Sequence, residues 1–413
     1  MTQNYPVQVE LTEGKDLLLA GVRPVETETV SLENGFGRIL AEDIRARENI
    51  PPFDRSPLDG YALRARDIAL ASREAPVTLT VTEEVPAGAV AGAPVGAMEA
   101  VRIMTGAPVP AGADAVVKYE DTCFTEHRVT LFTPAASGSN IVRAGEDVRA
   151  GDIVMEAGDV LNPARIGVLA GLGYPRVLVY RRPLVRIIST GDELVDIARD
   201  LAPGKIRNSS AYMIQAFLQS WGMDARIHPI VGDDKDQIRK ALETCMEDAD
   251  CVLTTGGVSV GDFDFVLPAM EAAGAAILFW KARMKPGMAT IGARKGKTLL
   301  VGLSGNPSAA VAALFVLCLP ALRRLCGRRD WELPVIQAVL AEAYDKPSPG
   351  GRVLPGRLEI RDGKPFFITQ KHQANGMISP WSRCNLVGMV PKGTGPLEKG
   401  SRIEAYFLTS AGF

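Results

Sequence analysis

One loop holds an unusual concentration of chemically useful side chains, and its sequence over residues 254–265 is TTGGVSVGDFDF. It follows a short apolar run that can be a buried strand, and it leads into a run that can open a helix. Glycines let a ligand approach the backbone, hydroxyls form hydrogen bonds, and carboxylates bind cations. These residues are Gly256, Gly257 and Gly261; Thr254, Thr255 and Ser259; and Asp262 and Asp264. The loop suits a phosphorylated ligand with a divalent cation, although a glycine-rich turn with solvated acids explains it equally well.

Further loops carry groups of the same kind, and each follows an apolar, β-like run. The candidate ligand groups in them are Thr190, Gly191 and Glu193; Asp233; Lys281, Lys285 and Pro286; and Asn306 and Ser308. Asn306 can cap a helix whose first residue is Pro307. Because the carboxyl ends of parallel strands meet at one edge of a sheet, we expect these loops to converge on one crevice.

The elements that must position these loops form an alternating pattern between residues 183 and 328. Strands are predicted over 184–188, 225–231, 251–254, 276–280 and 298–302, and helices over 209–221, 235–247, 265–273 and 307–325. This order predicts an α/β domain with a largely parallel sheet. The segment GARKGKT at 292–298 is one residue too short for a P-loop, so we expect a β-hairpin turn there.

The remaining chain is rich in short apolar segments broken by proline and glycine. Residues beyond 331 have the pattern of a small β-barrel, and residues 47–142 that of a second β-rich domain. The expected fold class is therefore a multidomain α/β and β protein.

Composition excludes several classes of protein. Lys plus Arg number 46 against 48 Asp plus Glu, which argues against nucleic acid as a partner. The six cysteines and three histidines lack the spacing of a zinc site. The N-terminus has no secretory pattern, and the apolar run 309–322 is too short for a membrane span and contains Pro320. We expect a cytoplasmic enzyme with no membrane contact, and a buried helix over that run.

Seven ordered segments together resemble the molybdopterin molybdotransferase family, which includes the gephyrin E domain and its plant counterpart. They are PPFDRSPLDGYALR at 51–64, VRIMTGAPVPAGADAVV at 101–117, AGEDVRAGDIV at 144–154, STGDEL at 189–194, TTGGVSVGDFD at 254–264, KPG at 285–287 and GLSGNPSAA at 302–310. The resemblance implies insertion of molybdate into adenylylated molybdopterin with release of AMP, assisted by Mg²⁺, in a homodimer. It also implies transient contact with the adenylyltransferase and with apo-molybdoenzymes.

The same resemblance implies a division into four domains. Residues 1–46 and 143–182 form a discontinuous N-terminal domain, 47–142 an inserted β-rich domain, 183–328 the molybdopterin-binding α/β domain, and 329–413 a C-terminal β-barrel domain.

Roles for individual residues follow from the resemblance and from the chemistry. We expect Asp59, Asp147, Glu193, Asp233 and Asp264 to be catalytic, with Glu193, Asp233 and Asp264 holding the cation. Lys281 and Lys285 are expected to bind molybdate or a phosphate. The remaining substrate-binding residues are Thr105, Thr190, Gly191, Gly256, Gly257, Ser259, Pro286, Asn306, Ser308, Ser379 and Ser382, with either Arg352 or Arg357 at the oxyanion. For each acid and lysine, a solvated surface position is the competing interpretation.

Some positions depart from the family pattern. Ser304 replaces a common proline, Met288 a common lysine, and Asn208-Ser209-Ser210 stands where Asp-Ser/Thr-Asn is frequent. These departures leave open whether molybdate or tungstate is the anion. An adenylyltransferase-like activity and a non-catalytic pterin-binding scaffold are the alternative functions. The adenylyltransferase lacks a counterpart to the first 180 residues of this chain. A scaffold does not require the acids, and the acids are kept here.

Overall fold

The computed structural model describes residues 5–259, 264–370 and 374–408, and the chain divides into two compact units. Unit 1 comprises Met1–Glu42, Ala157–Asn162 and Val177–Phe413, and unit 2 comprises Asp43–Glu156 and Pro163–Arg176. Asp262 and Gly261 of the glycine-rich loop lie outside the described residues. The finer division into four domains stays a prediction.

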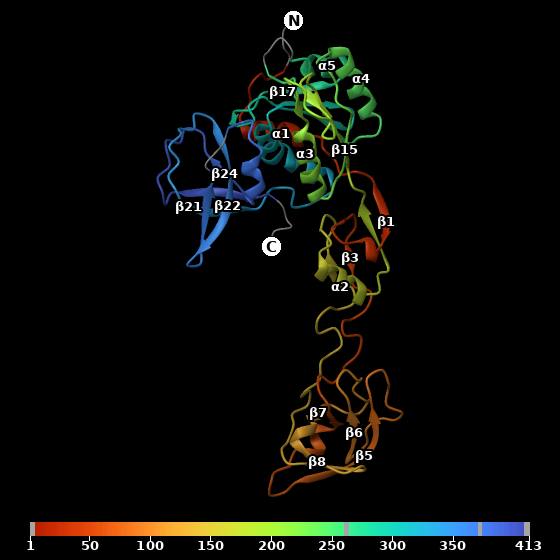
Figure 1. Ribbon diagram of the computed structural model, residues 1–413. Coiled ribbons are helices and arrows are strands. Elements are labelled where there is room, and N and C mark those ends of the chain that lie inside the picture. The colour runs from red at the N-terminus through yellow and green to blue at the C-terminus, as the bar shows by residue number, and fades with distance from the viewer. Residues whose placement is uncertain (1–4, 260–263, 371–373, 409–413) are drawn as a thin grey trace. The chain divides into compact units, whose positions relative to one another are not determined.

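The largest element of unit 1 is a six-stranded sheet with the order β15-β12-β16-β20-β19-β17 (Figure 1). Its strands are β15 Asp224–Ile227, β12 Leu184–Ser189, β16 Cys251–Thr255, β20 Thr298–Leu303, β19 Ile291–Lys295 and β17 Ala276–Trp280. The first four strands are parallel, and the last two are antiparallel to their neighbours. This confirms the predicted α/β fold with a largely parallel sheet.

Alternation of side chains along the central strands produces a core on each face of the sheet. Ile187 and Leu253 pack into one cluster, which also holds Ala211, Ile214 and Leu218 of α3 (Ser209–Ser220). On the other face Ile188 and Val252 pack against α4 (Lys235–Met246) and α5 (Val266–Ala272). Both faces are covered, which explains why β16 is buried along its whole length.

The apolar segment 307–325 is the central helix of the larger core. It consists of α6 (Pro307–Ala313), a π-helical turn η4 (Leu314–Cys318) and α7 (Leu319–Leu325). Pro320 lacks the N–H that an α-helix needs, and the π-helical turn lies directly before it. Within the described residues, only this segment is long and apolar enough to cross a membrane, and 94% of its most apolar window is buried. The expectation of a buried helix is confirmed.

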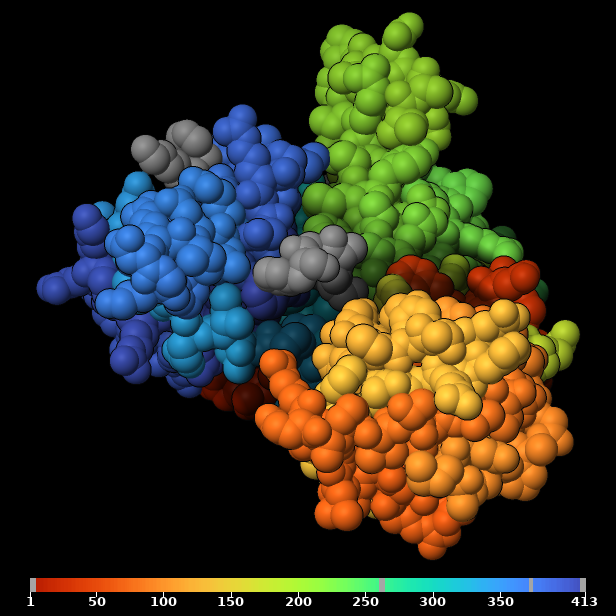
Figure 2. All heavy atoms as spheres, turned by 90° about the horizontal axis from the view of Figure 1, so that it is seen from below, coloured from red at the N-terminus to blue at the C-terminus, as the bar shows by residue number. Residues whose placement is uncertain are grey.

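The C-terminal part of unit 1 is a small barrel. Its sheet has the order β18-β22-β23-β21-β25-β24, and a further pairing of β22 with β24 closes the ring. The strands are β18 Met284–Lys285, β21 Val335–Leu340, β22 Gly351–Arg361, β23 Lys364–Thr369, β24 Leu386–Val390 and β25 Arg402–Phe407. A Cβ added to Gly356 would lie 2.2 Å from the Phe367 ring, so this glycine makes room for the ring in the barrel interior. Figure 2 shows this barrel as a compact lobe coloured blue.

Residues 291–303 form the β-hairpin that the sequence predicts in place of a P-loop. Lys295 pairs with Thr298 across the turn, and Gly296 takes a φ of +58°. That backbone conformation suits glycine at a tight hairpin turn.

Unit 2 contains a second six-stranded sheet, in the order β7-β4-β6-β5-β9-β8. These strands are β4 Gly60–Leu63, β5 Val77–Val85, β6 Glu99–Ile103, β7 Ala115–Lys118, β8 Thr122–Phe124 and β9 Arg128–Leu131. Apolar residues on its two faces fill two separate clusters. The unit also holds β3 (Ile44–Arg45), which pairs with β10 (Ile153–Met155), and the helix α2 (Pro163–Gly171). The β-rich character predicted for this region is therefore observed.

Candidate active site

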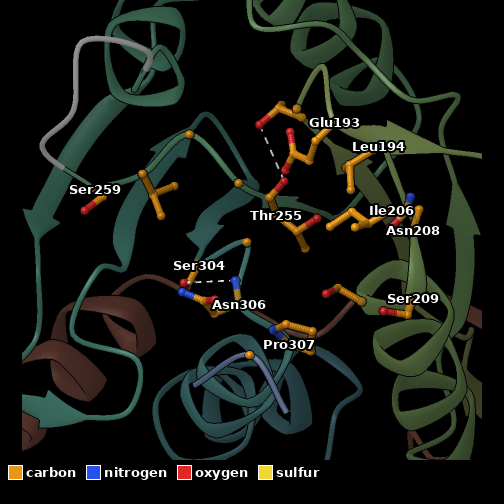
Figure 3. Close-up of a pocket in the computed structure, with 18 of the residues that line it drawn as sticks. Glu193, Leu194, Ile206, Asn208, Ser209, Thr255, Ser259, Ser304, Asn306 and Pro307 are labelled. Atoms are coloured by element: carbon orange, nitrogen blue, oxygen red, sulfur yellow. Dashed lines mark hydrogen bonds between the residues drawn. The ribbon is translucent and has the colours of Figure 1, made fainter. Parts of the chain in front are cut away.

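A cavity of about 620 Å³ opens at the carboxyl ends of the parallel strands in unit 1 (Figure 3). Because Ser189 pairs with Thr255 and Thr255 with Leu303, three strands end at the same level. The loops that follow them therefore meet at one place, as the sequence predicts for an open parallel sheet. Nine predicted site residues line the cavity, namely Thr190, Gly191, Glu193, Asp233, Gly256, Gly257, Ser259, Asp264 and Asn306.

Backbone hydrogen bonds between the loops form the floor of the cavity. Thr190 N–H donates to the Thr255 carbonyl at 2.9 Å, and Gly256 N–H donates to the Leu303 carbonyl at 3.1 Å. Gly256 has a φ of +99°, and a Cβ there would lie 2.4 Å from the Thr190 carbonyl oxygen. Glycine is therefore required at this position for two reasons, backbone conformation and close approach.

The acids of the cavity stand on loops beyond the strand ends. Glu193 is exposed, and its carboxylate folds back over Gly191, where an added Cβ would lie 2.4 Å from Glu193 Oε2. Asp233 accepts a hydrogen bond from the Asp192 backbone, and Asp192 accepts one from the Asp233 backbone, both at 3.2 Å. Asp264 is half-buried just before α5. The reciprocal pair fixes the Asp233 loop against the Glu193 loop.

These acids do not form a ready-made metal cage. Among residues 5–259, 264–370 and 374–408, no three His, Cys, Asp or Glu side chains are clustered closely enough to hold a metal ion by themselves. Mg²⁺ is usually held by one or two carboxylates together with substrate phosphates and water. Glu193, Asp233 and Asp264 line one cavity and fit that mode of binding, in which the phosphates complete the coordination.

The opposite wall of the cavity carries hydroxyls, amides and helix starts. Asn306 precedes α6, and its N–H donates to Ser304 Oγ at 3.2 Å. Asn208 caps α3 by accepting from the Ala211 N–H at 3.4 Å. Figure 3 draws Asn208 and Ser209 on one side of the cavity and Ser259 and Ser304 on the other. This wall offers hydrogen-bond donors without a buried cation.

The predicted lysine motif and Ser308 lie outside the wall of this cavity. Lys281 has a φ of +74°, and its Nζ lies 4.1 Å from the centre of the Trp280 ring. Lys285 is exposed on β18 and precedes Pro286 through a cis peptide bond. Ser308 is buried, with its Oγ accepting from Trp381 Nε1 at 2.9 Å and its N–H donating to the Asn375 carbonyl. Ser308 therefore holds the 374–381 segment against α6.

The predicted serines of the C-terminal part line a different cavity. Ser379 and Ser382 surround a space of about 520 Å³ together with Arg357 and Arg383. Arg352 is absent from this lining, and its guanidinium donates to the Pro347 carbonyl and to the Tyr344 hydroxyl. Of the two candidate arginines, Arg357 is the one that shares a cavity with both serines.

Three predicted site residues belong to unit 2. Asp59 Oδ1 accepts from both the N–H and the hydroxyl of Thr105, each at 2.7 Å. The backbone hydrogen bond from Thr105, followed by its hydroxyl, lowers the pKa of Asp59. Asp147 is exposed, and its backbone N–H donates to the Ile50 carbonyl. Asp59 thus ties the loop before β4 to the loop after β6, which holds Thr105 46 residues further on.

Further residues line the cavity beyond the nine expected ones. The sequence had already drawn attention to Thr255, Ser304, Pro307 and the segment Asn208-Ser209-Ser210, but it gave no indication of Leu194, Ile206, Arg207, Val258, Gly305, Gly376 and Ile378. The Asn-Ser-Ser start of α3 is a recognisable helix cap, and its position after a loop could have placed it at the strand ends. Gly376 and Ile378 come from the C-terminal segment and carry no local sequence signal.

Three family descriptions match successive parts of the chain. Residues 9–173 match "MoeA N-terminal region (domain I and II)", residues 186–324 match "Probable molybdopterin binding domain", and residues 337–408 match "MoeA C-terminal region (domain IV)". The central match contains the strand-end acids of the cavity.

Relatives cover nearly the full length. The molybdopterin molybdenumtransferase of Staphylococcus aureus (strain Mu50) is 38% identical over 382 residues, which are 92% of this chain and 91% of that protein. The protein of the same name from Staphylococcus epidermidis (strain ATCC 35984) is 35% identical over 94% of this chain and 93% of its own length. A crystal structure of a molybdopterin biosynthesis moeA protein from Pyrococcus horikoshii has a TM-score of 0.84 and 29% identity, covering 97% of this chain and all of the other.

Proposed function

The chain belongs to the molybdopterin molybdenumtransferase family, and from this premise we propose that it inserts molybdate into adenylylated molybdopterin and releases AMP. The observation that carries the proposal is the convergence of Glu193, Asp233 and Asp264 with the α3 and α6 starts around one cavity. This cavity lies within the segment matched as a molybdopterin-binding domain.

Release of AMP requires cleavage of a phosphoanhydride. When water attacks, a new bond forms between its oxygen and the adenylyl phosphorus, the bond to the bridging oxygen breaks, and the water gives up a proton. When a molybdate oxygen attacks first, the product is adenylyl molybdate, which water must then hydrolyse to AMP and molybdate. In both cases the pterin phosphate leaves with the bridging oxygen and its electron pair. Such a transfer depends on positioning and on neutralising the phosphate charges.

The residues of the cavity divide this work between its two walls. The glycine loop at Gly256 and Gly257 lets the phosphates approach the backbone, because neither residue has a Cβ. Ser259 and Asn306 supply donors to phosphate oxygens. The acids hold Mg²⁺, which supplies charge neutralisation when bound. The loop pairing of Asp192 with Asp233 keeps two of the acid-bearing loops in a fixed relation.

Molybdate is proposed to be recognised by cationic groups outside this cavity. Lys281 and Lys285 are compact ammonium donors suited to a tetrahedral oxyanion. Arg357, Ser379 and Ser382 form a second set of oxyanion donors around their own cavity. Substituting either lysine by alanine should raise the molybdate concentration needed for turnover by about tenfold, with little change in affinity for the adenylylated pterin. Equal weakening of both would assign the lysines to the phosphates.

We further propose that the working enzyme is a cytoplasmic homodimer and that Asp59, Thr105 and Asp147 contribute to the site. The family resemblance supports both ideas, and a shared site would explain acids predicted in both units. The family resemblance also supports transient contact with the adenylyltransferase and with apo-molybdoenzymes.

The direct test is a turnover assay with the purified full chain. Adenylylated molybdopterin is incubated with Mg²⁺, and AMP is measured before and after molybdate is added. The proposal predicts AMP release that depends on molybdate and on Mg²⁺. Binding of the pterin without any AMP release would instead favour a scaffold, and AMP transfer onto molybdopterin from ATP would favour the adenylyltransferase.

A further inference from the structure

The backbone at Lys281 has a conformation that its surroundings must hold. Lys281 takes a φ of +74°, in the left-handed region that a residue with a Cβ rarely occupies. Such conformations persist where neighbouring contacts fix them. The Lys281 N–H donates to the Thr290 carbonyl at 2.7 Å, and the Lys281 carbonyl accepts from the Val9 N–H at 3.1 Å. One of these two contacts therefore comes from the N-terminal part of the chain.

The N-terminal segment, residues 6–10, lies along the loop that holds the lysines. The Trp280 N–H donates to the Pro6 carbonyl at 3.0 Å, and the Arg283 N–H donates to the Val9 carbonyl at 2.8 Å. Val9 is 1% exposed, so its side chain anchors the segment in the core. Hydrogen bonds from both sides of Lys281 thus join this segment to the lysine loop, residues 280–285.

The side chain of Glu10 adds ionic contacts to these backbone bonds. Its Oε1 lies 3.3 Å from Arg283 Nε in the lysine loop and 2.7 Å from Lys392 Nζ. Lys392 stands on the loop that follows the barrel strand β24. Glu10 itself directly precedes the helix α1 (Leu11–Leu19). One carboxylate therefore connects the N-terminal segment, the lysine loop and the barrel.

The lysine loop also belongs to the barrel at its other end. Lys285 stands on β18, which pairs in parallel with β22, and its partner there is Arg352. The loop is thus fixed to the barrel at β18 and to the N-terminal segment at Val9 and Glu10. A carboxylate beside an anion site opposes anion binding by its charge alone. The contacts of Glu10 give it a different role, which is to hold the loop in place.

We propose that Glu10 is a positioning residue for the oxyanion-binding lysines, and that it acts through Arg283. By fixing Arg283, it keeps the backbone of the lysine loop in the conformation that presents Lys281 and Lys285. This inference rests on the proposed function, because that function assigns the molybdate anion to these two lysines.

The key variant is Glu10→Gln, which removes the charge and keeps the size of the side chain. Amide hydrogen exchange, measured by mass spectrometry on peptides that cover the lysine loop, should become about fivefold faster, because two ion pairs at a partly exposed site are lost. The molybdate concentration for half-maximal AMP release should rise about threefold, with unchanged affinity for the adenylylated pterin. An effect of charge alone would lower that molybdate concentration, so the two explanations predict opposite signs.

A double-mutant cycle tests whether Glu10 acts through Arg283. Arg283→Gln removes the same ion pair from the side of the lysine loop. If both residues act through one contact, the double variant should need no more molybdate than Glu10→Gln alone. Effects that multiply in the double variant would show that the two residues act independently, and would contradict this route.

A matched control is another glutamate that pairs with two cations. Glu26 accepts from Arg181 at 2.6 Å and from Lys297 at 2.8 Å, and its side chain is 60% exposed against 43% for Glu10. Lys297 lies in the turn of the hairpin formed by β19 and β20. Glu26→Gln should leave both the exchange of the lysine loop and the molybdate dependence unchanged. Thermal melting of each variant verifies that the fold is retained.

Each outcome decides the question. Faster exchange of the lysine loop together with a raised molybdate requirement in Glu10→Gln supports the proposal. Unchanged exchange, or a molybdate requirement that is unchanged or lowered, would overturn it, and so would equal changes in Glu26→Gln. The wild-type protein is assayed first, and failure to release AMP on addition of molybdate would reject the proposed function and this inference with it. A failure confined to the variants would reject the inference alone.

Discussion

The acids of the strand-end cavity and the acid Asp59 of unit 2 all lie close to a glycine in the sequence but have different surroundings. Asp59 Oδ1 accepts two short hydrogen bonds from Thr105, which lies on another loop of unit 2, 46 residues further along the chain. Glu193 instead extends from a loop over Gly191, on the wall of a 620 Å³ cavity. An acid whose oxygen accepts hydrogen bonds from another loop holds the two loops together, whereas an acid at a cavity wall is available to a ligand. The comparison teaches that the hydrogen bonds around an acid separate the two roles better than its sequence context does.

The largest expected effect is the loss of a cavity acid. Glu193→Gln and Asp264→Asn should each lower AMP release by at least about 100-fold, because a charge that holds the cation is removed. Neither side chain is in the core, so thermal unfolding should change little. Release of AMP at the wild-type rate by both variants would show that the cavity acids do not hold the cation. The contrast drawn with Asp59 would then no longer stand.

A complementation experiment tests whether the two regions work in one site. Asp59→Asn and Asp264→Asn proteins, each inactive alone, are mixed and allowed to exchange subunits. If each site takes one acid from each subunit, random pairing should restore about a quarter of wild-type AMP release. Verified exchange with no recovered activity would limit the role of Asp59 to its contact with Thr105.

The floor of the cavity should be sensitive to a single methyl group. Gly256→Ala combines a φ of +99° with a Cβ 2.4 Å from the Thr190 carbonyl oxygen, so we expect a loss of unfolding free energy of about 2 kcal/mol or more. Gly296→Ala, in the hairpin turn, has a positive φ but no neighbour within 4 Å, and should cost about 1 kcal/mol. Chemical denaturation of both variants measures the difference, and equal costs would show that the close approach at Gly256 relaxes freely.

The smallest expected effect concerns the titration of Asp59. Thr105→Val removes the hydroxyl donor but keeps the stronger contribution of the backbone N–H, so the pKa of Asp59 should rise only part of the way to its ordinary value. The folded-state pKa lies below the unfolded value. The stability from this carboxylate is therefore present above the unfolded-state pKa and is lost as pH falls through the folded-state pKa. NMR titration of the Asp59 carboxyl carbon checks the shift, and an unchanged midpoint would show that the hydroxyl contributes nothing.

Sequence periodicity was sufficient for the elements that bury apolar residues. The strands around 187 and 253 and the helix behind Pro307 are marked by runs that only a covered sheet and a core helix explain. Because parallel strands end together, the convergence of Thr190, Gly256 and Asn306 on one cavity also followed from the pattern.

The sequence could not reveal the positions that depend on distant contacts. The Ser308 hydroxyl is used by Trp381, 73 residues away, although the local sequence marks it as a free helix start. Lys281 takes a φ of +74° and its Nζ lies over the Trp280 ring, and its neighbours in sequence indicate neither feature.

Direct observation of a bound cation tests the central claim, that the strand-end acids of unit 1 hold the metal used with the substrate's phosphates. Electron paramagnetic resonance with Mn²⁺ in place of Mg²⁺ counts bound ions in the presence of AMP. The account predicts one AMP-dependent ion per chain in the wild type, lost in Glu193→Gln and Asp264→Asn. The ion should be kept in Asp234→Asn, because Asp234 caps α4 by accepting from the Gln237 N–H and is not among the residues that line the cavity. The same bound ion with unchanged affinity in Glu193→Gln and Asp264→Asn would contradict it.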